Sequence, residues 1–109
     1  MDDLEPGGTT MTYEVSQDPG GAAAVVTIAG ELDMTNVAEL EAAVAPIVER
    51  QPQRLVVDVS GLRFADSSAI ALWVRWANVV EHLEIREPSL LLRRVISRMG
   101  LAQRLRITP

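Results

Sequence analysis

The chain has 109 residues, of which 48% are hydrophobic and 23% are charged, so it has room for one domain with an ordinary core. It has no cysteine and a single histidine, His82, which excludes disulfides, thiol catalysis and multi-histidine metal sites. The net charge of −5 disfavours nucleic-acid binding, and no apolar run approaches the roughly 20 residues of a membrane-spanning helix.

The N-terminal segment is acidic and contains Pro6-Gly7-Gly8. We therefore expect residues 1–10 to be a disordered leader and residues 11–109 to form the folded domain. Because the first residues are negative where a signal peptide would be positive, we expect a cytoplasmic location.

Two strands are expected near the beginning of the domain, over residues 12–16 and 23–29. The turn residues Asp18-Pro19-Gly20-Gly21 lie between them, so the two strands are predicted to form a hairpin. Gly30-Glu31-Leu32-Asp33 then ends the second strand.

The first helix is expected to begin near Thr35 or Asn36, because apolar residues recur on one helical face from this point. Asn36 and Glu39 have the spacing of a capping box. Pro46 removes a backbone donor late in this helix, which predicts a kink there.

Residues 55–59, Leu-Val-Val-Asp-Val, are the strongest strand signal in the chain and are typical of a central strand covered on both faces. A loop is expected over residues 60–66, followed by an apolar helix from Ser67 to about Val80. Core packing is favoured for both of its tryptophans, Trp73 and Trp76, although their different directions on the helix leave one of them as a candidate interface anchor.

A short strand is predicted over residues 83–86, and Pro88 and Ser89 open a third helix. Its buried side is expected to consist of Leu91, Leu92, Val95, Ile96 and Met99. Gly100 and Leu101 are predicted to form a Schellman cap, and residues 105–107 a last strand. Five of the ten arginines lie in the last seventeen residues, where a solvated helix face is favoured over a site for an acidic partner.

The predicted order is β-β-α-β-α-β-α-β. Strands that alternate with helices indicate an α/β fold, with a mixed sheet whose core is parallel and which is covered by helices. A single domain is expected, and a monomer is the default.

The segment that carries the most chemistry is Asp66-Ser67-Ser68, which follows the strongest strand and opens a helix. Ser67 or Asp66 is expected to cap this helix. A phosphate at this point is favoured by unpaired backbone N–H groups and by the helix dipole. Ordinary capping is the simpler interpretation of the pattern. No histidine base and no phosphate-binding glycine loop accompany it, so an enzyme and a cofactor are not expected.

Three groups of residues resemble the anti-sigma factor antagonist (STAS) family. They are Asp58-Val59-Ser60 with Phe64-Ala65-Asp66-Ser67-Ser68-Ala69-Ile70, then Gly30-Glu31-Leu32-Asp33, and finally Pro88-Ser89 with Met99-Gly100-Leu101. The resemblance extends over nearly the whole folded region. It implies a STAS-like domain that binds a kinase-type anti-sigma factor and releases it when Ser67 is phosphorylated. A phosphatase would reset the switch.

The same resemblance implies a partner-binding surface formed by Glu31, Asp33, Met34, Asp66, Ser68 and Ala69. An N-cap role for the loop at Glu31 to Met34 is nearly as well supported. Ala69 departs from the family pattern, which has glycine at this position, and its methyl group could slow phosphorylation. A STAS module used as a fixed scaffold, such as a stressosome-like component or a transporter-associated subunit, is therefore the alternative. A nucleotide-binding module is a weaker one.

Overall fold

The computed structural model describes residues 10–109, so residues 1–9 of the expected leader lie outside the described part of the chain. The predicted order of strands and helices is confirmed. The elements are β1 (Met11–Gln17), β2 (Ala23–Leu32), α1 (Val37–Glu49), β3 (Arg54–Ala65), α2 (Ser67–Ala77), β4 (His82–Arg86), α3 (Leu90–Arg98) and β5 (Arg106–Thr108).

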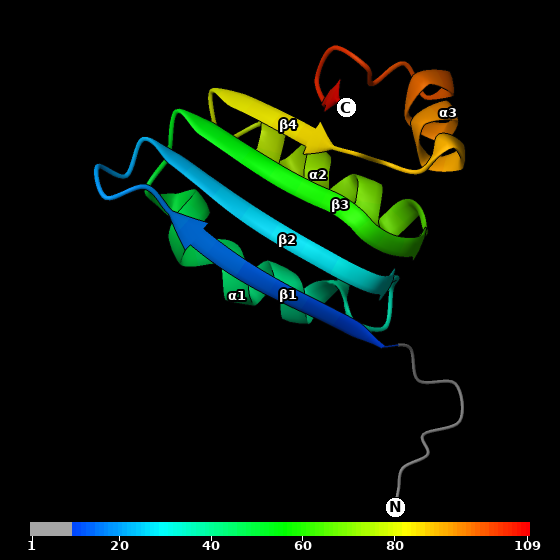
Figure 1. Ribbon diagram of the computed structural model, residues 1–109, viewed down its shortest axis with the longest axis horizontal. Coiled ribbons are helices and arrows are strands. Elements are labelled where there is room, and N and C mark those ends of the chain that lie inside the picture. Colours follow the sequence, from blue (N-terminus) through cyan, green and yellow to red (C-terminus); the bar gives the residue numbers. More distant parts are fainter. Residues whose placement is uncertain (1–9) are drawn as a thin grey trace, which may run out of the picture.

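The five strands form one sheet in the order β1-β2-β3-β4-β5. The hairpin prediction is confirmed, since β1 pairs antiparallel with β2, while β2 to β5 are mutually parallel. Figure 1 shows α1 and α2 side by side behind the sheet, which leaves the face toward the viewer without a helical layer. The central position predicted for β3 is confirmed, and helices cover one of its faces, while Val56, which does not belong to the main core cluster, is 1% exposed.

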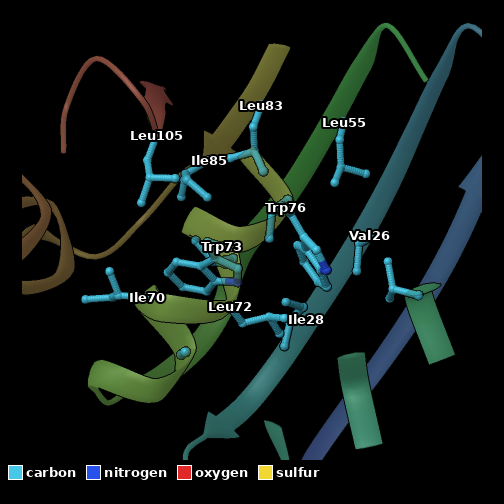
Figure 2. Packing of buried hydrophobic residues seen from close by; sticks show 14 of the residues in the cluster. Val26, Ile28, Leu55, Ile70, Leu72, Trp73, Trp76, Leu83, Ile85 and Leu105 are labelled. Atoms are coloured by element: carbon cyan, nitrogen blue, oxygen red, sulfur yellow. The ribbon is translucent and has the colours of Figure 1, made fainter. Parts of the chain in front are cut away.

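The core lies between the sheet and the helices, and Figure 2 shows it around α2. Both tryptophans of this helix are buried, so core packing holds for Trp73 and for Trp76. Both rings lie among aliphatic side chains from the strands (Figure 2). Arg75, on the outer side of the same helix, binds Glu41 of α1 with its Nη2 3.0 Å from Oε1, which ties the two helices together.

β3 is longer than predicted, because it continues through residues 60–65, which were expected to form a loop. The reason is that β2 also runs on to Leu32 and keeps pairing with β3. At two register shifts β3 has one residue more than β2; Gly30 pairs with Leu62 after the first shift, and Leu32 pairs with Ala65 after the second. These extra pairs carry the chain to the edge of the sheet where α2 begins. That helix ends at Ala77, somewhat before the predicted end.

The Schellman cap of α3 is confirmed: Gly100 has φ +74°, its N–H donates to Ser97 O, and the Leu101 N–H donates to Ile96 O. The predicted buried side of α3 is wrong at two positions, since Leu91 is 72% and Met99 is 52% exposed. Figure 1 shows the reason, because α3 lies past the end of β4 and does not cover the sheet. Leu92 and Ile96 are the fully buried residues of this helix.

Two structural features are absent from residues 10–109, a membrane-spanning helix and a cluster of metal ligands. None of the helices there is long and apolar enough to cross a bilayer. Within the same range, no group of three or more histidine or acidic side chains is arranged to hold a metal ion.

Candidate functional site

The two sequence elements that carry the site, Gly30 to Asp33 and Asp66 to Ser68, lie at neighbouring strand ends. β2 and β3 are parallel, so their carboxyl ends meet at the same edge of the sheet. Two hydrogen bonds join them there. The Asp66 N–H donates to Leu32 O over 3.2 Å, and the Met34 N–H donates to Asp66 Oδ2 over 3.1 Å.

Asp66 is the N-cap of α2, which decides between the two residues proposed for that role. Its Oδ1 accepts hydrogen bonds from the backbone N–H groups of Ser68 (2.9 Å) and Ala69 (3.4 Å) and from the Ser68 hydroxyl (2.5 Å). One carboxylate oxygen therefore holds the start of α2 and the other holds the loop after β2. Asp66 thus fixes the position of Ser67 relative to that loop.

The electrostatics of Asp66 follow from these contacts. Partial burial by itself raises the pKa of the carboxyl, but it is outweighed by hydrogen bonds from the Ser68 hydroxyl and from the N–H groups of Met34, Ser68 and Ala69, so the pKa lies below the usual value of 3.8. The group is consequently a carboxylate at neutral pH. The residue that precedes Ser67 therefore carries a negative charge.

Ser67 is the first residue of α2 and is exposed to solvent. A hydroxyl in this place is accessible to a kinase or a docking protein. The expectation of free donors for a phosphate needs a correction, because the N–H groups of Ser68 and Ala69 already donate to Asp66. A phosphate would therefore meet a carboxylate where unpaired donors were expected.

Ala69 is fully buried, with its methyl group in the core cluster. A partner at this surface would therefore meet the backbone around Ala69 and not its side chain. The methyl group that departs from the family pattern lies in the core and not on the surface. Ser68, in contrast, is half-buried with its hydroxyl on Asp66.

The loop after β2 is held by its own polar groups. Asp33 Oδ1 accepts from the Thr35 N–H and hydroxyl, at 2.9 and 2.6 Å. Asn36 lies at the N-cap position of α1, as expected, but its side chain makes no capping bond there, so the capping-box prediction is wrong. Instead its amide accepts from the Asp33 N–H (3.0 Å) and donates to Glu31 O (2.9 Å), which holds the loop in one shape.

Gly30 has a definite role in this edge of the sheet. Its φ is +93°, and a Cβ at this position would collide with the carbonyl oxygen of Thr10. The same oxygen accepts a hydrogen bond from the Glu31 N–H over 2.8 Å. The glycine that precedes Glu31-Leu32-Asp33 is therefore required by the close approach of the chain just before β1.

The predicted surface residues other than Ala69 lie at the edge of the sheet where α2 begins. Met34 is 76% exposed, and Glu31 is half-buried with its Oε2 3.5 Å from Arg63 Nη2. The sequence interpretation missed Phe64, which is 53% exposed and precedes Asp66 by two residues. Its signal was present, because a large aromatic residue next to the Asp-Ser-Ser segment belongs to the family pattern. The site thus combines carboxylates with two exposed apolar side chains.

Comparison with known families assigns the chain to one of them. A family model described as Mlab, STAS domain matches residues 15–108. The chain belongs to the STAS domain family. Among curated proteins, no sequence match was found.

Several solved structures share the STAS fold of this chain. An anti-sigma factor antagonist from Mycobacterium paratuberculosis superimposes with a TM-score of 0.81 at 24% identity, over 92% of this chain and 86% of that one. The anti-sigma factor antagonist SpoIIAA in its unphosphorylated form gives 0.75 at 19% identity, over 90% and 89% of the two chains.

A third structure shows the same fold in a modified protein. The Bacillus cell fate determinant SpoIIAA in the phosphorylated form gives a TM-score of 0.70 at 19% identity, over 90% of this chain and 92% of that one. At these identities the likeness establishes the five-stranded α/β fold of the present chain. It leaves the function to be argued from the site.

Proposed function

We propose that this STAS domain is an anti-sigma factor antagonist, which binds an anti-sigma factor through the surface around Ser67 and is switched off by phosphorylation of that serine. The observation that carries the proposal is the exposed hydroxyl of Ser67 at the first position of α2. The helix start below it is already capped by Asp66. A change at Ser67 therefore acts on docking and leaves the fold in place.

The charge at the site explains how phosphorylation would work. A phosphate adds a charge of about −1.5 to −2 at neutral pH. Here that charge would stand beside the Asp66 carboxylate, whose hydrogen bonds occupy the N–H groups of Ser68 and Ala69. The phosphoserine therefore gains little from the helix start and repels a partner that docks against this acidic surface. Met34 and Phe64 supply exposed apolar contacts for the unmodified state.

In this proposal the chain acts by binding, and phosphoryl transfer is the work of its partners. The anti-sigma factor with kinase activity transfers the γ-phosphoryl group of ATP to Ser67 Oγ, and a phosphatase removes it. Both steps take place in the cytoplasm, where ATP and sigma factors are found. The present chain contributes the acceptor hydroxyl and the docking surface.

The experiment begins with the partner. The tagged chain is purified from its own cells, and the bound proteins and phosphorylated residues are identified by mass spectrometry in the same run. The captured anti-sigma factor is then incubated with the chain and ATP. Labelling is expected on wild type and lost in Ser67→Ala. Label that persists in Ser67→Ala contradicts the proposal.

Binding is measured separately by calorimetry. Ser67→Ala should bind the anti-sigma factor about as well as wild type, and Ser67→Glu should bind at least about tenfold more weakly, which is about 1.4 kcal/mol. Ser97→Glu is the matched control, because Ser97 is an exposed serine on a different helix, α3. Equal affinities of Ser67→Glu and Ser97→Glu would contradict the proposal that a negative charge at Ser67 weakens binding of the anti-sigma factor.

A fixed STAS interaction module is the second candidate. One observation favours it, which is that the matching family model carries the name Mlab. In that case co-purification should yield scaffold or transporter proteins without an anti-sigma factor of the kinase type. No phosphate should then be found on Ser67.

A further inference from the structure

A groove lies between the end of β3 and α3, beside the site described above. Its volume is about 130 Å³. The groove is lined mainly by apolar side chains, which are Leu62, Phe64 and Ala65 of β3 and Leu91, Leu92 and Val95 of α3.

The walls of the groove are apolar and open to solvent. Leu91 is 72% exposed and Phe64 is 53% exposed, while Leu62 and Leu92 below them are buried. Large apolar side chains that stand together around a hollow mark an interaction site more often than singly scattered ones do. A cavity of about 150 Å³ holds a benzene-sized group, so this hollow matches about one large apolar side chain.

Arginines lie beside the groove. Arg63 lines it and is paired with Glu31, whereas Arg94 and Arg98 do not line it but follow Leu91 by three and seven residues, which places them on the same side of α3. α3 contains no acidic residue, and Arg94 and Arg98 form no ion pair with any residue in the range 10–109. These arginines stand out in a chain whose net charge is −5.

An apolar surface with arginines beside it could fit an anionic membrane or an acidic protein segment, and the shape of the surface distinguishes between these two ligands. An anionic membrane binds amphipathic helices that present a protruding apolar face. Here the apolar residues enclose a hollow, which fits a side chain that enters it from a partner. Arginines beside an apolar pocket are complementary to carboxylates that flank an inserted Leu or Phe.

We propose that this groove binds an acidic amphipathic segment of a partner protein, which inserts an apolar side chain between Phe64 and Leu91 and pairs its carboxylates with Arg94 and Arg98. The proposal goes beyond the switch at Ser67, because the groove does not use the Ser67 hydroxyl. The groove shares Phe64 with the docking surface around Ser67, but groove binding should survive in Ser67→Ala, so the two proposals are tested separately.

The test is a selection of displayed random 16-residue peptides against the full chain, with the enriched peptides measured by fluorescence anisotropy. Enriched peptides should be acidic, with Leu or Phe at helical spacing. Leu91→Asp should weaken their binding on the order of tenfold or more, as expected for the loss of an interface anchor. Arg94→Glu/Arg98→Glu should weaken it as well, and wild-type binding should weaken as salt is raised.

Two matched variants control for general effects of a new charge. Leu90→Asp changes an exposed leucine on α3 that does not line the groove, and Arg93→Glu changes an arginine outside the stripe formed by Leu91, Arg94 and Arg98. Both should bind the peptides like wild type, and circular dichroism should show that all variants remain folded.

Three results would overturn the proposal. The first is that no enriched peptide loses affinity in Leu91→Asp, and the second is that the selected peptides are neutral or basic. The third comes from a parallel sedimentation assay with phosphatidylglycerol vesicles: binding that Leu91→Asp abolishes, without any acidic peptide enriched, would assign the groove to a lipid surface.

Discussion

α2 and α3 begin in similar ways but differ in how firmly they are attached to the protein. Each has a polar N-cap side chain, Asp66 for α2 and Ser89 for α3. α2 then buries five residues, including both tryptophans, whereas α3 buries Leu92 and Ile96 alone. The firmly packed helix presents one small exposed hydroxyl, and the loosely attached helix presents an open apolar groove.

The two helices also differ in charge. The start of α2 is capped by the Asp66 carboxylate, while α3 carries three arginines and no acidic residue. One chain thus offers an acidic surface and a basic surface that meet near Phe64. A rigid acidic surface suits a switch based on added negative charge, and the basic groove suits an acidic partner.

The largest expected effect tests the difference in packing. Trp73→Ala should lower the free energy of unfolding by about 3–5 kcal/mol, because Trp73 is fully buried on α2 and leaves a large cavity. Leu92→Ala on α3 should cost about 2 kcal/mol, at the low end for a buried leucine, since α3 lies at the margin of the core. Urea denaturation followed by circular dichroism gives both values.

A Trp73→Phe variant separates the effect of lost side-chain volume from the effect of the indole N–H group. The indole Nε1 of Trp73 is buried without a hydrogen-bond partner among residues 10–109, so phenylalanine removes volume but breaks no bond. Its cost should be clearly smaller than that of alanine. If Leu92→Ala proves as damaging as Trp73→Ala, the contrast between the helices is not one of packing.

The next largest effect compares the two N-caps. Asp66→Ala removes bonds to two backbone N–H groups of α2, the Ser68 hydroxyl and the Met34 N–H, and should cost about 2 kcal/mol or more. Ser89→Ala removes one bond, from the Leu92 N–H at 3.1 Å, and should cost about 1 kcal/mol. Thermal unfolding of the two variants measures the difference. Equal losses would mean that the additional bonds of Asp66, to a second backbone N–H, the Ser68 hydroxyl and the Met34 N–H, add nothing to stability.

Much of this contrast was visible in the sequence. The alternation of strands and helices predicted the element order, because the hydrophobic periods of the two structures differ. The Schellman cap at Gly100 was predicted from local residue types, since it depends on neighbours within one turn. The residues around Ser67 were predicted from a family pattern, which contains information about contacts between distant segments.

The failures share a physical cause, which is that long-range contacts overrode local preference. Residues 60–65 look like a loop alone but pair with β2. Asn36 has capping-box spacing, but its side chain forms hydrogen bonds with the backbone of Asp33 and Glu31 instead. The shape of that loop depends on the neighbouring strand. Leu91 and Met99 belong to an apolar helical face, yet the position of α3 beyond the sheet leaves them exposed.

The smallest expected effect concerns pH, and it isolates the acidic cap of α2. The pKa of Asp66 in the folded chain lies below the usual value of 3.8, because hydrogen bonds to its carboxylate outweigh the effect of burial. Between the folded and unfolded pKa values the unfolded chain binds more protons, so stability falls as the pH falls. The contribution of Asp66 is complete above about pH 4–5 and is lost as the pH drops through the folded pKa.

Glu84 gives a matched comparison away from α2. Burial raises the pKa of its carboxyl, but hydrogen bonds from Arg54 and Thr108 and the charges of Arg54 and Arg86 lower it below the usual 4.5. In wild type the urea midpoint should fall as the pH is lowered from 7 to 3. Asp66→Asn and Glu84→Gln should each make this fall smaller. The reductions caused by the two substitutions should be additive, because the two side chains have separate partners. An acid limb unchanged in Asp66→Asn would show that the bonds to Met34, Ser68 and Ala69 do not favour the charged carboxylate.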